Sequence, residues 1–329
     1  MQPYLQMFGP FLGLFLVFML FVLLSLFGIA PSAFYSFYNV KTIITQTVIT
    51  GIGALGMTMV IISGGIDLSV GSVIALSTVV TAQVLNLGGS EGNAGLWLPF
   101  AAVGCAALVG GACGLFNGAV SAALRMVPFI VTLGMMQIAR GLAKWVGKEQ
   151  TVLSPDNWLN GFMVVDPTPG WLLFAPGVWL LIGLTVFLSI MLTRTVFGRY
   201  IFALGSNENT ARLCGINVTG TRTLIYTLSG IFTGIAGIMQ FANLTVGDPT
   251  AAQGMELDII AAVIIGGGSL SGGEGTARGS LIGALMMAVL RNGCNLVGIP
   301  NYVQNILIGA IIIGAVAVDR YKQRIPARQ

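Results

Sequence analysis

The sequence predicts an all-α polytopic membrane protein of about ten transmembrane helices, with discontinuous helices at glycine-rich breaks. Of its 329 residues, 55% are hydrophobic and only 8% are charged, whereas a soluble domain carries about 25% charged residues. Several apolar runs approach the roughly 20 residues that a helix needs to cross a bilayer. These runs are expected to be helices because an unclosed strand cannot satisfy its backbone in lipid.

The apolar runs follow one another along the whole chain. The first, 8–30, carries no charge, and no Lys or Arg precedes it. It also exceeds the usual length of a signal-peptide core, so we expect it to remain as the first span. The second and third runs, 43–62 and 70–87, flank a glycine-rich segment. The remaining expected spans are 96–120, 127–146, 171–192, 223–245, 257–268, 276–298 and 302–318.

Glycines recur at helical spacing within two of the expected spans. They are Gly110, Gly114 and Gly118 in one span, and Gly230 with Gly234 in another. Small residues four apart let helix backbones approach closely in lipid. We therefore expect these glycines to pack helices together rather than to line a pore.

Ten spans place both termini on one side, and basic residues indicate that this side is the cytoplasm. The expected inside segments hold ten basic residues and the outside segments hold three. The inside residues are Arg125, Arg194, Arg199, Arg212, Arg222, Arg278, Arg320, Lys322, Arg324 and Arg328. The outside residues are Lys41, Lys144 and Lys148, alongside Glu91, Glu149, Asp156, Asp166, Asp248 and Glu256.

Missing residues exclude several classes of function. The chain has no histidine, which removes histidine-dependent catalysis and histidine metal sites, and we expect no metal site. None of the four lysines lies in a phosphate-binding loop of the GxxxxGK[ST] type, so the chain is not expected to hydrolyse ATP by itself. Arginines occur singly between apolar runs, which argues against a nucleic-acid surface.

The first glycine break carries the sharpest motif. An aspartate between two apolar spans costs of order 3 kcal/mol at mid-bilayer, so Asp67 is expected at an interface, in a cavity or on backbone donors. Asp67 or Ser69 could cap the following helix, and a direct role in a transport path is the alternative. The candidate path residues are Ser63, Gly64, Gly65, Asp67, Ser69 and Gly71.

A second glycine-rich break lies about 203 positions further on. Paired breaks of this kind indicate a duplicated architecture with a transport path at the breaks, although two glycine-rich turns also look alike by composition alone. The candidate residues here are Glu256, Asp258, Gly266, Gly267, Gly272 and Gly273.

The segment 193–222 is the longest expected cytoplasmic connection. It contains one candidate short helix, Glu208–Cys214. Asn207 is a suitable N-cap, Glu208 favours the positive helix start, and Gly215 suits a left-handed C-terminal cap. On the opposite side, the loop 147–170 with its three acidic residues is the longest expected external segment.

Four segments together carry a resemblance to a known family. They are Ser63–Ser72; Thr195–Arg199 with Ala203–Asn207 and Ala211–Ile216; Glu256–Val263 with Gly266 and Gly267; and Leu270–Thr276. In these segments, and over nearly its whole length, the chain resembles the inner-membrane permeases of monosaccharide ABC importers of the ribose, xylose and galactose type. The resemblance implies one transmembrane permease domain over 1–329, multi-pass in the cytoplasmic membrane, that moves a ribose-like sugar by alternating access.

The same resemblance implies the partners of the chain. These are an ATPase subunit that carries the ATP and Mg²⁺, an extracytoplasmic sugar-binding protein and a second permease copy, identical or related; the chain itself is expected to hold no cofactor. The 193–222 segment would dock on the ATPase through a coupling helix. The candidate coupling residues are Gly205, Asn207, Glu208, Ala211, Arg212 and Gly215.

Two alternative functions, and the role of the polar residues within the spans, remain open at this stage. Nucleoside and branched-chain amino-acid permeases belong to the same broader superfamily, although the intact DLSVGS motif favours a sugar as the cargo. An ion-coupled secondary transporter would use Asp67 as its proton or cation carrier. Polar residues within the spans could contact sugar or bond across helices, which is the commoner use. They are Asn117, Gln137, Arg140, Asn243, Arg291, Asn292 and Asn295.

Overall fold

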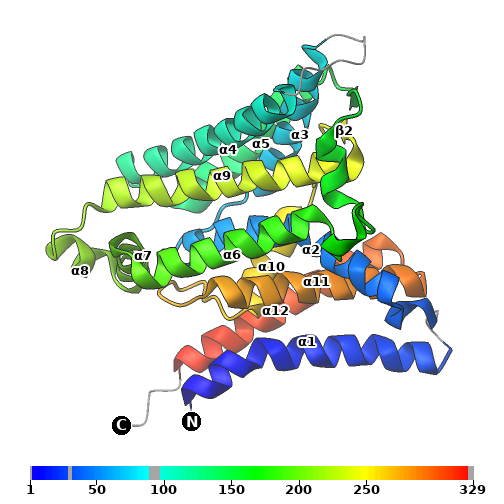
Figure 1. Cartoon of the computed structure of the whole chain (residues 1–329). Coiled ribbons are helices and arrows are strands. Elements are labelled where there is room, and N and C mark those ends of the chain that lie inside the picture. Colours follow the sequence, from blue (N-terminus) through cyan, green and yellow to red (C-terminus); the bar gives the residue numbers. More distant parts are fainter. Residues whose placement is uncertain (1, 29–31, 89–96, 325–329) are drawn as a thin grey trace.

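The computed structural model describes residues 2–28, 32–88 and 97–324. Long helices run side by side, and the short helices α7 and α8 lie together at one end (Figure 1). The α-helices are α1 (Gln2–Leu26), α2 (Phe37–Ile62), α3 (Val70–Asn86), α4 (Leu98–Ala123), α5 (Pro128–Val146), α6 (Pro176–Arg194), α7 (Val196–Ser206), α8 (Glu208–Leu213), α9 (Val218–Leu244), α10 (Met255–Ile265), α11 (Ala277–Val297) and α12 (Asn301–Arg324). Three 3-10 helices are η1 (Ser32–Tyr35), η2 (Trp158–Met163) and η3 (Gly170–Leu172), and the strands β1 (Val152–Leu153) and β2 (Val246–Gly247) pair antiparallel.

The all-α class is confirmed among the described residues, but the number of ten full spans is not. Six helical segments are long and apolar enough to cross a membrane: Gly9–Leu26, Phe37–Ile62, Leu98–Ala123, Gly170–Arg194, Val218–Leu244 and Ala277–Val297. The helix expected at 257–268 is α10, which has 11 residues and is therefore only about 16 Å long. That length is roughly half of a hydrocarbon core.

Helix boundaries follow local capping as well as hydropathy. The span expected from residue 43 begins at Phe37, because the side-chain oxygen of Ser36 accepts a hydrogen bond from the Asn39 amide at 3.2 Å and caps the helix. The first turn of α2 is therefore helical although it precedes the apolar run. Residues 29 and 30 of the first expected span lie outside the described residues, as do Glu91 and Arg328 of the expected loops.

Glycines join α4 to α9, as expected from their spacing. A Cβ at Gly110 would overlap the carbonyl oxygen of Gly230, and a Cβ at Gly114 would overlap that of Tyr226. A Cβ at Gly234 would meet the carbonyl oxygen of Ala106 in the same way. The two helices lie side by side along most of their length (Figure 1). Their backbones therefore touch directly, which only glycine permits at these positions.

Large apolar side chains cover the outer faces of several helices. Leu12 and Leu16 of α1 are 60% and 58% exposed, and Phe187 and Ile190 of α6 are each 54% exposed. Such a surface is unfavourable in water and suits contact with lipid chains or another apolar surface.

Candidate functional site

The first glycine break ends α2 at the end of the molecule where α7 and α8 lie. The amide of Gly65 donates to the carbonyl of Val60, and that of Gly64 to the carbonyl of Ile61, both at 2.9 Å. Gly64 has φ of +81°, a conformation that favours glycine because it has no Cβ. The chain then runs in irregular conformation to Ser69, and α3 begins at Val70.

Asp67 is buried in this break and closes a turn on its own backbone. It is 3% exposed, and its Oδ1 accepts hydrogen bonds from the Ser69 amide at 2.8 Å and the Ser69 hydroxyl at 2.6 Å. Ser69 is the N-cap residue of α3 but makes no capping hydrogen bond. The Ser69 side chain therefore does not cap α3. The Asp67 side chain bonds to Ser69, the residue before the helix, and not to the first turn of the helix.

Two neighbouring helices fasten the break. Asn117 of α4 donates to the Ser69 hydroxyl at 3.0 Å. The Thr132 hydroxyl of α5 accepts from the Leu68 amide at 3.2 Å and lies 3.3 Å from the carbonyl oxygen of Ile66. The irregular backbone thus has hydrogen-bond partners inside the protein.

Gly71 links the first break to α10. A Cβ at Gly71 would overlap a carboxylate oxygen of Glu256 and the carbonyl oxygen of Ala252. The start of α10 therefore packs against the start of α3. Nearby, Arg140 of α5 donates to the carbonyls of Pro249 and Ala251, each at 2.9 Å, and holds the loop before α10.

The six candidates of the second break do not form one cluster. Asp258 is buried and makes a two-pronged ion pair with Arg291 of α11, at 2.7 and 2.9 Å. Glu256 and Asp258 lie at the start of α10, while the four glycines follow its end. Asp258 therefore joins α10 to α11 instead of lying in the break.

The expected short helix is present at 208–213 and is capped at both ends. The Asn207 side chain accepts from the Thr210 amide at 2.9 Å. Gly215 has φ of +84°, and the Ile216 amide returns to the Ala211 carbonyl at 3.1 Å. This is the hydrogen-bond pattern of a glycine-terminated helix.

Gly205 brings the segment 193–222 into contact with both glycine breaks. A Cβ at Gly205 would overlap the carbonyl oxygen of Ile62, the last residue of α2, and would lie 2.6 Å from the Gly273 amide nitrogen. That amide donates to the same Ile62 carbonyl at 2.8 Å. Gly272 also packs on the Gly205 backbone. The two breaks and the C-terminal end of α7 therefore meet backbone to backbone.

Glu208 ties α8 to α9. Its carboxylate accepts from Arg222 at 2.5 Å and from Arg212 at 2.9 Å. Partial burial acts to raise the pKa of Glu208, but the hydrogen bonds and positive charges of both arginines outweigh it and leave the pKa below its ordinary value. Glu208 is therefore ionised at neutral pH and holds both guanidinium groups.

Ala211 does not lie on the outer face of α8. It is 4% exposed and packs against the interior of this chain, so it does not contribute to the outward surface of this helix. Leu213 of the same helix is 88% exposed. The outward surface of α8 is therefore built around Leu213, with Asn209 and Thr210 also exposed.

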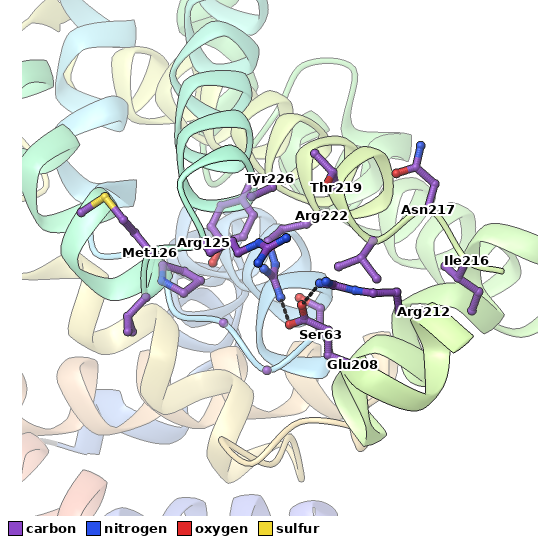
Figure 2. Close-up of a pocket in the computed structure, with 16 residues that line it drawn as sticks. Ser63, Arg125, Met126, Glu208, Arg212, Ile216, Asn217, Thr219, Arg222 and Tyr226 are labelled. Carbon is purple, nitrogen blue, oxygen red and sulfur yellow. Dashed lines mark hydrogen bonds and ion pairs between the residues drawn. The ribbon is translucent and has the colours of Figure 1, made fainter. Parts of the chain in front are cut away.

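A pocket of about 580 Å³ opens where these elements meet (Figure 2). It brings residues of the first break and of the segment 193–222 together. Its lining comprises Ser63, Gly64, Gly65, Ala122, Arg125, Met126, Val127, Pro128, Glu208, Arg212, Ile216, Asn217, Val218, Thr219, Arg222 and Tyr226. Asp67, Ser69 and Gly71 do not line it.

Sequence reasoning did not single out Thr132 or Tyr226. A Cβ at Gly65 would overlap the Tyr226 hydroxyl, so this tyrosine is the reason that residue 65 is glycine. A tyrosine inside an apolar span gives no signal of this contact from the sequence alone.

Most polar residues within the spans bond inside the protein, including Arg140, Arg291, Asn292 with Asn39, and Asn295 with Gln304.

Comparisons with known proteins consistently find similarity to transport permeases. A family model described as the permease component of branched-chain amino acid transport systems matches residues 39–316. The chain is 43% identical over 300 residues to the ribose import permease protein of Escherichia coli (strain K12), covering 88% of each. It is 36% identical over 326 residues to the ribose import permease protein of Bacillus subtilis (strain 168), covering 97% of this chain and 94% of the relative.

Two relatives carry the names of other sugars. The fructose import permease protein of Rhizobium meliloti is 36% identical, with 89% of this chain and 81% of the relative covered. The L-arabinose transport system permease protein of Escherichia coli (strain K12) is 38% identical, with 88% and 85% covered. No solved structure matches the chain significantly.

Proposed function

The chain belongs to the family of transport permease components matched at residues 39–316, and we propose that it is the membrane-spanning subunit of an ATP-driven importer of a monosaccharide. The cargo follows from the relatives, whose names specify ribose, fructose and L-arabinose. ATP and Mg²⁺ act on a separate ATPase subunit, and a sugar-binding protein delivers the cargo outside the membrane. The chain contributes a gated path rather than a catalytic site.

The contact of Gly205 with Ile62 and Gly273 carries the proposal. A coupling segment must pass a movement of the ATPase to the path, and here it touches both helix breaks through backbone atoms. The residues Ser63, Gly64, Gly65, Asp67, Ser69 and Gly71 shape the first break. The glycines 266, 267, 272 and 273 form the second, and Glu256 and Asp258 hold α10 in place beside them.

Transport by the reconstituted complex tests the proposal. The chain is placed in liposomes with its ATPase and binding protein, and uptake of labelled ribose, fructose and L-arabinose is measured. Uptake of one of these sugars that requires ATP and survives a protonophore is expected. Uptake that continues without the ATPase and collapses with a protonophore would instead support an ion-coupled transporter using Asp67. That alternative is disfavoured because Asp67 is already engaged by Ser69.

The exposed face of α8 is the proposed ATPase contact. Leu213→Glu places a charge on the most exposed large apolar residue of this helix, and we expect the ATPase no longer to co-purify. Leu153→Glu is the matched control, because Leu153 is 73% exposed in β1. β1 pairs with β2, which lies at the opposite end of the molecule from α8 (Figure 1). Equal co-purification of the ATPase with both variants would place the docking surface elsewhere.

The end that holds α8 is proposed to be cytoplasmic. The start of α1 and the end of α12 lie at this end (Figure 1), and so does Arg125 in the pocket beside α8. Lys41 lies on the opposite side, where it pairs with Asp166 at 2.7 Å. The charge distribution agrees with the positive-inside rule and supports the proposal that both termini are cytoplasmic.

The opposite end is proposed to receive the sugar-binding protein, through the loop 147–170. Asp156 and Asp166 are exposed there, and β1 anchors the loop to β2. A second permease copy is proposed to complete the path, because one chain of this type supplies half of it. The mass of the complex purified in nanodiscs checks this: a fully active transporter with one permease copy would contradict it.

A further inference from the structure

The pocket beside α8 carries an excess of positive charge. Three arginines and one carboxylate line it: Arg125, Arg212, Arg222 and Glu208. Glu208 pairs with both Arg212 and Arg222. Arg125 is exposed in the turn between α4 and α5, and no hydrogen-bond acceptor or carboxylate among the described residues pairs with it. Two positive charges therefore remain uncompensated, which a neutral sugar does not require.

Two helix starts add to this positive potential. Val127 and Pro128 open α5, which has 19 residues, and Val218 opens α9, which has 27; all three residues line the pocket. The N-cap residue of α5, Val127, has no side chain that can accept a hydrogen bond from the first turn. The positive ends of both helix dipoles favour an anion. The first turn of α5 has no side-chain cap, whereas Asn217 caps the first turn of α9.

A buried donor without a partner also lies in the pocket wall. Tyr226 is 1% exposed, and its hydroxyl has no hydrogen-bond partner in the described part of the chain. This hydroxyl lies against Gly65, and Tyr226 projects from α9 toward the pocket in Figure 2. A buried polar group left unpaired costs free energy, and an acceptor in the pocket would remove that cost.

We propose that this pocket binds an organic phosphate, with Arg125 as its main ligand. Guanidinium groups match phosphate oxygens in geometry and charge. A volume of about 580 Å³ lies within the range of small-molecule sites, roughly 300–1,000 Å³, and exceeds what a bare phosphate fills. Met126, Val127 and Ile216 supply apolar lining for the organic part. The phosphate is that of a soluble ester or of an anionic lipid headgroup.

The position of the pocket gives the ligand influence over coupling. A phosphate held by Arg125 also attracts Arg222, which Glu208 now holds. Binding therefore competes with the link between α8 and α9. An anion on the cytoplasmic side would in this way adjust how tightly the coupling helix is tied to the path.

Direct binding tests the proposal. The full-length chain is placed in nanodiscs of phosphatidylcholine, and glycerol 3-phosphate is titrated by calorimetry, with glycerol as the uncharged control. We expect saturable binding of glycerol 3-phosphate and no binding of glycerol. Arg125→Gln should weaken it at least about tenfold, while Arg125→Lys should retain part of it. Arg194→Gln is the matched control, because Arg194 is exposed in the last turn of α6 and does not line the pocket.

Nanodiscs that contain phosphatidylglycerol separate the two sources. Undiminished binding of glycerol 3-phosphate there identifies a soluble ester as the ligand. Loss of that binding, or a melting temperature that phosphatidylglycerol raises in wild type and not in Arg125→Gln, identifies the lipid headgroup. The proposal is overturned if neither probe has an effect that depends on Arg125, or if Arg194→Gln acts equally. It is also overturned if adding the ATPase abolishes binding, because the pocket would then be a protein contact.

Discussion

Replacing Gly205 by alanine should uncouple the chain by separating α7 from the two breaks. The new Cβ would overlap the Ile62 carbonyl oxygen and crowd the Gly273 amide, which are themselves hydrogen-bonded at 2.8 Å. These are backbone atoms, so no side-chain rotation can relieve the overlap. The ends of α7 and α2 must move apart instead.

The energetic cost can be worked out from this geometry. Overpacking of a filled interior costs about 1–3 kcal/mol, and loss of the hydrogen bond between Gly273 and Ile62 adds about 1 kcal/mol. Alanine recovers at most about 1 kcal/mol through its higher helix propensity. The net loss is about 1–3 kcal/mol, which is enough to shift the contact without unfolding a chain of this size.

Gly183→Ala is the control for this variant. Gly183 lies in α6, and a Cβ there would meet no atom within 4 Å, so this substitution should be neutral or slightly stabilising. ATP-dependent uptake and the melting temperature in nanodiscs are measured for both variants. We expect Gly205→Ala to insert normally, melt lower and lose most uptake. If it transports and melts like Gly183→Ala, the backbone contact does not transmit coupling and the reasoning is wrong.

Three further variants test the remaining contacts. Glu208→Gln should lower the melting temperature at pH 7, because the ion pairs of Glu208 stabilise the fold above the unfolded-state pKa. These pairs are lost as the pH falls through the lowered folded-state pKa of Glu208, so the difference from wild type should vanish once the pH lies below that pKa. Gly114→Leu should prevent stable assembly of α4 on α9, while Gly104→Leu, where a Cβ would meet no atom within 4 Å, should fold normally as judged by gel filtration. Asp258→Asn should cost about 3 kcal/mol by leaving Arg291 unpaired, and adding Arg291→Gln should restore part of the melting temperature; no recovery would mean that the ion pair is not what the first change disrupts.

Local signals predicted the short helix α8 accurately. Asn207, Glu208 and Gly215 identify where α8 begins and ends, because caps depend on residues within one helical turn. The side that faces inward is not local. Ala211 is buried by elements that the sequence does not place beside it, so its inward position has no local signal. Leu213, which is exposed, carries no sequence signal of its own in a chain where apolar residues are common.

Long-range pairing explains the other differences. Asp258 and Glu256 follow each other closely in sequence and were grouped with the second glycine break. Asp258 instead meets Arg291, 33 positions away, which no periodicity indicates. Similarly, Gly65 reads as a turn residue, yet its lack of a side chain is required by Tyr226 of α9. Glycines and acids between or within apolar runs are thus recognisable from the sequence as unusual, while their partners are not.

The contacts around α8 differ in how much movement they pass on. The Glu208 ion pairs involve long side chains that can follow a displaced partner, so they limit the position of α8 against α9 without fixing it. The contact at Gly205 has no side chain between the backbones, and packed interiors rearrange in discrete steps rather than stretch. A displacement of α7 must therefore move Ile62 and Gly273 together. This shared movement would act on both breaks at once, which is what a gate formed at two discontinuous helices requires.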